Sequence, residues 1–397
     1  MAQEDISEID YRLVVPIVVN SLLIHIVVSL VRVTTSYRAV ELEVPVVWIG
    51  AIAAAFALFP IFLAVWVGRF IDRGNDAVAV WIGSGLITLS CAGFAIFPSA
   101  IALLVFTALA GTGHLFMHSA NQLLCVRAGG ENNMDRVFGN YMLAAALGQG
   151  LGPFVVGWLG GSATVPPTGL LFTLGFGLSA VTLAIALAIP RGREAAGKKK
   201  GGEVMPLRAL LRLPGVKAVI AAGIFISTAQ DLIVIYLPVL GTERAIEAEV
   251  IGVLLAVRAG FSMVARVFYA RMVEAFGREP LMVVFTFVAA LAFLLLAAPL
   301  PLWAMHVTVA VMGFTIGTAA LVSVTTVIDR TPKPARGTAN SLRVVGNRIG
   351  QVALPFGAGL VAAATGVAGI LVAIAVTLAA SAATVKLSRP ARKAADV

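Results

Sequence analysis

The stretch Gly148-Gln149-x-x-x-Pro153-Phe154 returns 202 residues later as Gly350-Gln351-x-x-x-Pro355-Phe356, and both copies lie in otherwise apolar sequence. The same offset relates further pairs of positions along the chain: Ile49-Gly50 and Ile251-Gly252, Arg69 and Arg271, Asp72 and Glu274, Gly111 and Gly313. One offset that holds over several separated landmarks indicates an internal duplication. The sequence therefore predicts two copies of one structural unit.

The composition indicates that this unit is a bundle of membrane helices. Hydrophobic residues make up 59% of the chain and charged residues 12%, and the mean hydropathy is +0.97, far from the values of a soluble domain. Apolar runs of about 20 residues, the length that crosses about 30 Å of hydrocarbon, recur along the sequence. We predict an all-α membrane protein with twelve spans, at 13–33, 46–67, 77–97, 100–124, 137–159, 168–189, 216–240, 248–268, 281–300, 302–326, 340–363 and 366–386.

The positions of lysine and arginine predict the orientation of these spans. With the N-terminus in the cytoplasm, 22 of the 29 basic residues fall on the cytoplasmic side, and only Arg32, Arg38 and Arg244 fall on the opposite side. Cytoplasmic loops carry an excess of basic residues, so we predict an inner-membrane protein with both termini in the cytoplasm. The basic excess follows from this topology, and we expect no nucleic-acid partner.

Six spans per copy is an even number, so the second copy enters the membrane in the same direction as the first. This arrangement is a parallel repeat, related by an axis along the membrane normal. The basic segment between the copies has no apolar periodicity and is predicted to be a cytoplasmic linker. The predicted domains are a six-helix bundle at 1–190, the linker at 191–214, and a six-helix bundle with a short cytoplasmic tail at 215–397.

The sequence GRFIDRGND, which follows the second span, resembles the loop signature of the major facilitator superfamily of transporters. Gly68, Asp72 and Arg73 match the signature, whereas Asn75-Asp76 stand where the family usually has a Gly-Arg pair. The resemblance extends over the whole chain and implies a transporter that works by alternating access. A loop acid can contact the positive N-terminal end of a helix in one conformation only, and plain solvated charges are the alternative. We predict a cytoplasmic gate formed by Gly68, Arg69, Asp72, Arg73, Arg271 and Glu274.

Gly148, Gly152, Pro153 and Gly157 in the fifth span resemble a motif of the antiporter branches of the same superfamily. Small residues let helix backbones approach closely in lipid, and a proline removes one hydrogen bond from a membrane helix. The pattern predicts a sliding or bending face, with simple helix packing as the alternative, and the resemblance implies export. Thr107 stands where drug exporters of the superfamily commonly have an arginine, so their scheme of proton coupling is not carried over.

Ionisable side chains deep in a membrane are costly and usually mark a pathway for substrate or ions. Arg258 lies about 15 Å into its predicted span and Arg348 about 12 Å from the cytoplasmic end, at 1.5 Å per residue. Asp231 is the only acid deep in the predicted spans, and we predict that it carries a coupling proton, with a static pair to Arg258 as the alternative. The residues predicted to bind substrate are Arg258, Arg348, Asn347, Gln351, Gln149, His114 and His118.

His114 and His118 are four residues apart and are expected to face the same side of one helix. They lack the glutamate of the HExxH metalloprotease motif, so protease chemistry is not predicted. His25 is predicted as a second proton carrier, because imidazole titrates near neutral pH. Hydrogen-bonded core histidines are one alternative, and a metal transporter with three imidazoles is another. We expect no resident metal and no cofactor, because no Cys, Asp or Glu cluster accompanies these residues.

These features together predict a secondary active transporter of a small organic compound, not an enzyme. The sequence has no nucleotide-binding P-loop, so an ion gradient, most simply of protons, is expected to supply the energy. Proton-coupled efflux is the first hypothesis, and an organic-anion (carboxylate) importer or exchanger is the second, because deep arginines outnumber the single deep acid. A metal-ion transporter and a multipass membrane sensor or enzyme are minor alternatives. The expected partners are the substrate, protons and membrane lipids, with the chain acting as a monomer.

Overall fold

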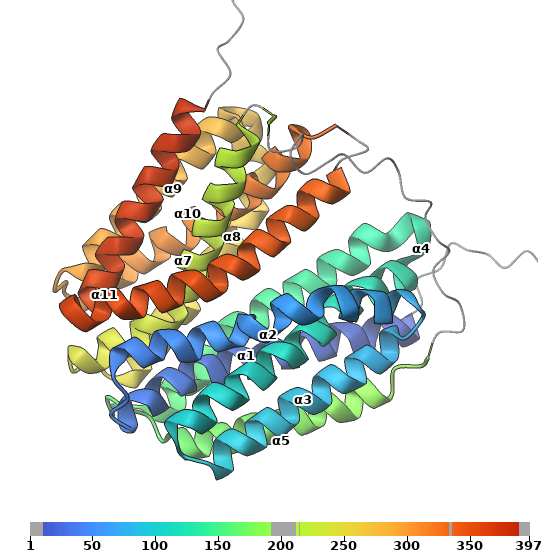
Figure 1. Ribbon diagram of the computed structural model, residues 1–397, viewed down its shortest axis with the longest axis horizontal. Coiled ribbons are helices and arrows are strands. Elements are labelled where there is room, and N and C mark those ends of the chain that lie inside the picture. Colours follow the sequence, from blue (N-terminus) through green and yellow to red (C-terminus); the bar gives the residue numbers. More distant parts are fainter. Residues whose placement is uncertain (1–10, 192–211, 214, 333–335, 389–397) are drawn as a thin grey trace, which may run out of the picture. The chain divides into compact units, whose positions relative to one another are not determined.

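The computed structural model describes residues 11–191, 212–213, 215–332 and 336–388. Every regular element in these ranges is a helix (Figure 1). The helices are α1 Tyr11–Glu41, α2 Val46–Asp72, α3 Asp76–Ile96, α4 Ala100–Gly160, α5 Thr168–Leu187, α7 Val216–Glu243, α8 Ala248–Phe276, α9 Arg278–Ala297, α10 Leu302–Asp329 and α11 Arg336–Leu387. Most of the predicted linker 191–214, including the lysine run 198–200, lies outside the described residues.

The described helices contain eleven segments that are long and apolar enough to cross a membrane. Two of them, Ala100–Gly129 and Arg136–Gly160, lie within α4. The remaining predicted span, 340–363, lies within α11, which is divided by Gly366 with φ of 68° and ψ of −171°. A positive φ of this kind suits glycine because it has no Cβ. The prediction of an all-helical, multipass membrane protein is confirmed.

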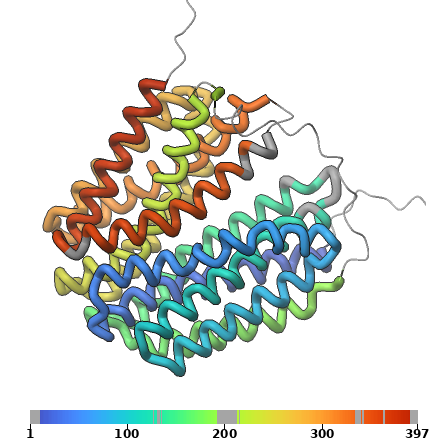
Figure 2. The backbone as a smooth tube through the Cα atoms, in the orientation of Figure 1, coloured from blue at the N-terminus to red at the C-terminus, as the bar shows by residue number. Residues whose placement is uncertain are grey.

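Helix α4 bends back on itself, which is why it holds two spans. The hydroxyl of Tyr141 lies 2.9 Å from Nδ1 of His118, although the two residues are 23 positions apart. In a straight helix the same separation would be about 35 Å. A Cβ added at Gly129 would lie only 2.7 Å from Cα of Met134, so the bend needs a residue without a side chain. The two arms of α4 run side by side in Figure 2.

The chain forms two compact units, and each unit is built from two separate segments of the sequence. The first unit comprises Met1–Lys198 and Ile235–Ala259, and the second comprises Lys199–Val234 and Gly260–Val397. The end of α7 and the start of α8 therefore belong to the first unit. There the amides of Ala248 and Glu249 donate hydrogen bonds to the carbonyls of Ala163 (2.8 Å) and Gly161 (3.1 Å). The predicted domains at 1–190 and 215–397 remain a prediction.

The duplicated tetrad packs in the same way in each unit. A Cβ at Gly148 would lie 2.5 Å from the carbonyl oxygen of Leu22 on α1, and a Cβ at Gly350 would lie 2.6 Å from Cγ2 of Ile224 on α7. Leu22 and Ile224 are themselves 202 positions apart. The offset therefore relates both the glycine and the helix against which it packs, as expected for a parallel repeat.

Candidate functional site

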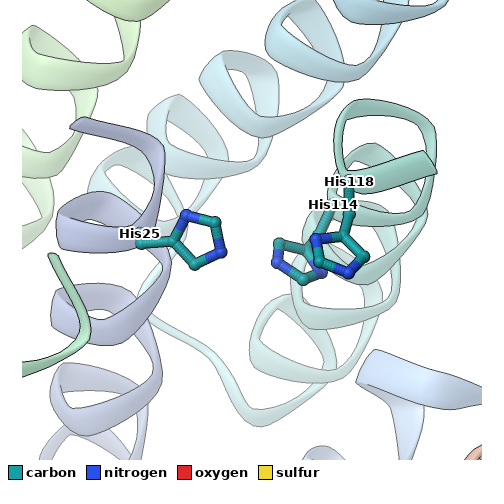
Figure 3. Close-up of side chains that lie close together, drawn as sticks. All are labelled: His25, His114 and His118. Atoms are coloured by element: carbon teal, nitrogen blue, oxygen red, sulfur yellow. The ribbon is translucent and has the colours of Figure 1, made fainter. Parts of the chain in front are cut away.

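Three histidines from two helices meet inside the first unit. His25 lies on α1, and His114 and His118 lie one turn apart on α4. Their ring centroids are 5.6 Å apart for His25 and His114, 6.4 Å for His25 and His118, and 5.5 Å for His114 and His118. One ring nitrogen from each residue can be chosen so that all three lie within 4.8 Å of one another. Figure 3 shows His25 facing the other two rings across the gap between their helices.

The hydrogen bonds around this cluster fix the tautomers of two rings. Nδ1 of His25 lies 2.7 Å from the carbonyl oxygen of Ser21, and a carbonyl only accepts, so Nδ1 carries the proton. With the Gln122 amide in its assigned orientation, its side-chain nitrogen, which only donates, lies 2.9 Å from Nε2 of His118. The Nδ1–H of His118 then donates to the hydroxyl of Tyr141. In both rings Nε2 is the nitrogen with a lone pair.

The glycines of the fifth predicted span bring α4 close to its neighbours in the first unit. A Cβ at Gly148 would lie 2.8 Å from Cβ of His25, so this glycine makes room for the histidine cluster. A Cβ at Gly152 would lie 2.7 Å from the carbonyl oxygen of Ile26, and a Cβ at Gly157 would lie 2.8 Å from Cα of Gly252 on α8. Such contacts are typical of small residues at membrane helix interfaces. The bending role of Pro153 stays a prediction.

An apolar pocket lies beside the histidine cluster in the first unit. Arg32, Phe56 and Thr107 line it together with aliphatic side chains from α1, α2, α3 and α4. The ring of Phe56 lies 5.6 Å from that of His114 and 5.2 Å from the guanidinium carbon of Arg32. The hydroxyl of Thr107 is buried and, among the described residues, has no hydrogen-bond partner. The pocket has a volume of about 30 Å³, far below the roughly 300–1,000 Å³ of a ligand pocket, so in this conformation it is too small for an organic substrate.

A chain of polar side chains joins α7 and α11 in the second unit. The amide nitrogen of Gln351 donates to a carboxylate oxygen of Asp231 at 2.8 Å. Its amide oxygen accepts a hydrogen bond from Arg348 at 3.1 Å. Asn347 lies next to Arg348, and its buried side-chain oxygen has no hydrogen-bond partner among the described residues. Gln351 thus links the deep acid to one of the deep arginines.

The other predicted substrate residues lie elsewhere. Arg258, on α8, belongs to the first unit and is buried, with 4% of its surface exposed. Gln149 is exposed, whereas the adjacent Gly148 is buried. The structure therefore brings together Asp231, Gln351 and Arg348 in one unit, and the three histidines in the other.

The predicted gate residues are mostly exposed, and a different acid is buried beside them. Asp72, Arg69 and Arg73 at the end of α2 are exposed, as are Arg271 and Glu274 at the end of α8, and Gly68 has open space where a Cβ would stand. The buried acid is Asp76 at the start of α3. Its carboxylate forms a 2.5 Å ion pair with Arg127 of α4, and its other oxygen accepts a hydrogen bond from the amide of Ala77.

The same ion pair exists in the second unit with the charges exchanged. The 202-residue offset maps Asp76 onto Arg278 and Arg127 onto Asp329, and these two residues also form an ion pair. Next to it, Glu279 pairs with Arg330. Each pair joins the start of the third membrane span of its repeat to the end of the fourth span. The sequence interpretation missed these residues, although the offset applied to charged positions would have found them.

Comparisons with known proteins agree with this architecture. A family model described as the Major Facilitator Superfamily matches the chain twice, at residues 17–245 and 219–396. The structure of a variant of the nucleoside transporter NupG is similar over 95% of this chain and 100% of that chain, with a TM-score of 0.80 and 14% identity. A bacterial homolog of the human lysosomal transporter Spinster is similar over 98% of each chain, with a TM-score of 0.73 and 15% identity. A comparison with curated proteins finds no match.

Proposed function

Because the chain belongs to the major facilitator superfamily, we propose that it is a proton-coupled secondary transporter that exports a small organic compound. In this proposal the membrane is the inner membrane, both termini are cytoplasmic, and protons move inward as substrate moves outward. The similar structure of NupG is that of a nucleoside transporter, so nucleosides are among the compounds to test. A sequence identity of 14% supports only a shared fold and not a shared substrate.

The observation that carries the proposal is the hydrogen-bonded chain Asp231–Gln351–Arg348. Asp231 is the sixteenth residue of the 28-residue helix α7, so it lies near the middle of a span. A hydrogen bond to an ionised carboxylate is roughly twice as strong as one between neutral groups. Protonation of Asp231 would therefore weaken its hydrogen bond with Gln351 and, through Gln351, change how the guanidinium of Arg348 is held for contact with a ligand. Proton binding and substrate binding at this place are then linked.

The charge of the substrate sets the direction of that linkage. A substrate with a cationic or N–H donor group would bind ionised Asp231 and compete with the proton, which gives exchange of substrate for protons. An anionic substrate would prefer protonated Asp231 and a released Arg348, which gives movement of substrate together with protons. Export by antiport, supported by the resemblance of the Gly148-to-Gly157 motif to antiporter branches, therefore favours a substrate that is not an anion.

The test is transport into proteoliposomes with an imposed pH gradient of either sign. The probes are ethidium as a cation, benzoate as a carboxylate and uridine as a nucleoside, each with a protein-free control. Exchange for protons predicts accumulation when the lumen is acidic and release of luminal protons. Accumulation only when the outside is acidic would contradict antiport. Transport insensitive to the gradient in both directions would contradict proton coupling altogether.

An organic-anion transporter is the second candidate, and the burial of Arg258 favours it. A guanidinium with 4% of its surface exposed is costly inside a membrane helix, and such residues often mark a pathway for substrate or ions. Arginine can bind a carboxylate through two parallel hydrogen bonds, whereas lysine keeps the charge but loses this geometry. Arg258→Lys should therefore weaken benzoate transport and spare uridine. Equal loss for both probes, or no loss for either, would contradict a carboxylate contact at Arg258.

A further inference from the structure

We propose that His25, His114 and His118 bind a divalent transition-metal ion of the Zn²⁺ type inside the first unit. This site goes beyond the transport proposal and does not depend on it, because metal binding can be measured without substrate or a pH gradient. It also departs from the expectation, drawn from sequence, of no resident metal. The argument rests on the spacing of the three rings, on the tautomers that their partners impose, and on the chemistry of imidazole ligands.

The spacing of the rings is close to that of a metal-bound set. With Zn–N bonds of about 2.0–2.1 Å and tetrahedral angles, imidazole centroids around one ion stand about 5.2 Å apart and the ligand nitrogens about 3.3 Å apart. The observed centroid separations are 5.5, 5.6 and 6.4 Å, and one nitrogen of each ring can be chosen so that all three lie within 4.8 Å of one another. Closure by about 1–1.5 Å, mainly of His25 toward His118, would complete the site, and rotation of one side chain supplies such a movement.

The surroundings of the rings prepare them as ligands. Neutral imidazoles bind metals through one nitrogen, and the other N–H is usually held by a carbonyl or another acceptor, which orients the ring. His25 donates its Nδ1–H to the carbonyl of Ser21, and His118 donates its Nδ1–H to Tyr141. Both rings therefore keep Nε2 for coordination. These are the outer contacts expected of a histidine-ligated site.

Gln122 is the one group that competes with a metal ion. Its side-chain nitrogen donates to Nε2 of His118, the atom that would coordinate the ion. Metal binding must break this hydrogen bond, so removal of the Gln122 amide should make binding tighter. A purely structural histidine cluster predicts that the same change brings no gain in metal affinity. Gln122 therefore separates the two interpretations.

The ligand set indicates which ion fits. Imidazole suits Zn²⁺ and related ions such as Co²⁺ and Ni²⁺, whereas Mg²⁺ and Ca²⁺ prefer oxygen ligands. Among the described residues, the group that could share one ion contains three histidines and no carboxylate. Three protein ligands leave a fourth position of a tetrahedral ion open, and a hydroxide, chloride or other anion there would offset the charge.

The test uses the full chain, purified in detergent through a tag without histidines and stripped of metal with a chelator. Zn²⁺ is titrated by calorimetry, and Co²⁺ by the visible absorption that tetrahedral nitrogen coordination produces. We expect one ion per chain for the wild type. His25→Asn keeps a donor for the Ser21 carbonyl but removes the ligand nitrogen, and it should weaken binding by at least about tenfold. His306→Asn is the matched control, because His306 on α10 is the only other histidine of the sequence.

Two changes of neighbouring residues keep the proposal testable if a histidine variant does not fold. Tyr141→Phe removes the acceptor for His118 and should weaken binding by about 10–100-fold. Gln122→Leu should strengthen it roughly two- to tenfold, the worth of one competing hydrogen bond. Absence of one-to-one binding in the wild type would overturn the proposal. Binding unchanged in both His25→Asn and Gln122→Leu would overturn it as well, because the ion would then lie elsewhere.

Discussion

The repeat-related ion pairs give a prediction whose size can be worked out from the structure. The perturbation removes the charge of one partner, by Asp76→Asn or Arg127→Gln, or exchanges both residues, by Asp76→Arg with Arg127→Asp. The exchanged pair copies the arrangement that the second unit already has at Arg278 and Asp329. If the two ion pairs stabilise their repeats in the same way, exchanging the positions of the two charges should change the stability little.

The magnitude follows from burial and geometry. The Asp76 side chain is 4% exposed and the Arg127 side chain 31%, and they are joined at 2.5 Å. Removing a partner from a fully buried pair costs about 3–5 kcal/mol, but Arg127 retains some solvent. We therefore expect each single variant to lose about 1.5–3 kcal/mol, the range for a hydrogen bond to a charged group.

The exchanged variant should recover most of that loss. It also gives up a carboxylate at the start of α3, where an acid interacts favourably with the helix dipole by about 0.3–1 kcal/mol. In the second unit, Glu279 supplies an acid in the first turn of α9 beside Arg278, and α3 has no such substitute. The exchanged variant should thus stay within about 1 kcal/mol of the wild type, whereas Asp76→Arg alone should be the least stable.

The assay is equilibrium unfolding in mixed detergent micelles, followed by the fluorescence of the five tryptophans. A double-mutant cycle gives the coupling energy between the two positions. The control is the corresponding exchange in the second unit, Arg278→Asp with Asp329→Arg. If the losses of Asp76→Arg and of Arg127→Asp, each measured singly, simply add in the exchanged variant, the pair has no coupling and the reasoning from the repeat is refuted.

Two further predictions concern helix contacts. Gly252→Ala should impair transport or folding, because its Cβ would lie 2.6 Å from Cα of Gly157 and 2.7 Å from the carbonyl oxygen of Pro153. The control is Gly177→Ala on α5, where a Cβ would meet open space. Equal behaviour of the two variants in transport and thermal unfolding would rule out a role for close helix approach at Gly252. Asp72→Asn should lower transport and change the labelling of cysteines placed in the loop after α2, while membrane insertion stays normal. The reason is that a helix-end contact worth about 0.3–1 kcal/mol is lost in one conformation. Wild-type transport in this variant would exclude Asp72 from the gate.

The sequence predicted the fold because the duplication and the length of the apolar runs constrain it strongly. The tetrad at Gly148 and its copy at Gly350 revealed the repeat, and in the structure both glycines pack on repeat-related residues. The spacing of His114 and His118 placed them on one face of a helix. That His25 would reach them depended on how α1 crosses α4, which local patterns do not encode.

The features that the sequence interpretation missed arise from tertiary contacts. Asp76 was noted only as a departure from the family's loop signature, and its partner Arg127 lies 51 residues away. The allocation of Ile235–Ala259 to the first unit follows from contacts such as those of Ala248 and Glu249 with the segment after α4. Periodicity and composition describe each helix by itself and give no access to such pairings.

The most direct test of proton-coupled transport compares Asp231→Asn with the wild type in proteoliposomes. Glu247→Gln, which changes an exposed acid between α7 and α8, is the control. For the probe that the wild type moves, Asp231→Asn should abolish accumulation driven by a pH gradient and retain exchange of labelled for unlabelled substrate without one. Gradient-driven accumulation by Asp231→Asn equal to that of the wild type and Glu247→Gln would contradict the assignment of Asp231 as the proton carrier.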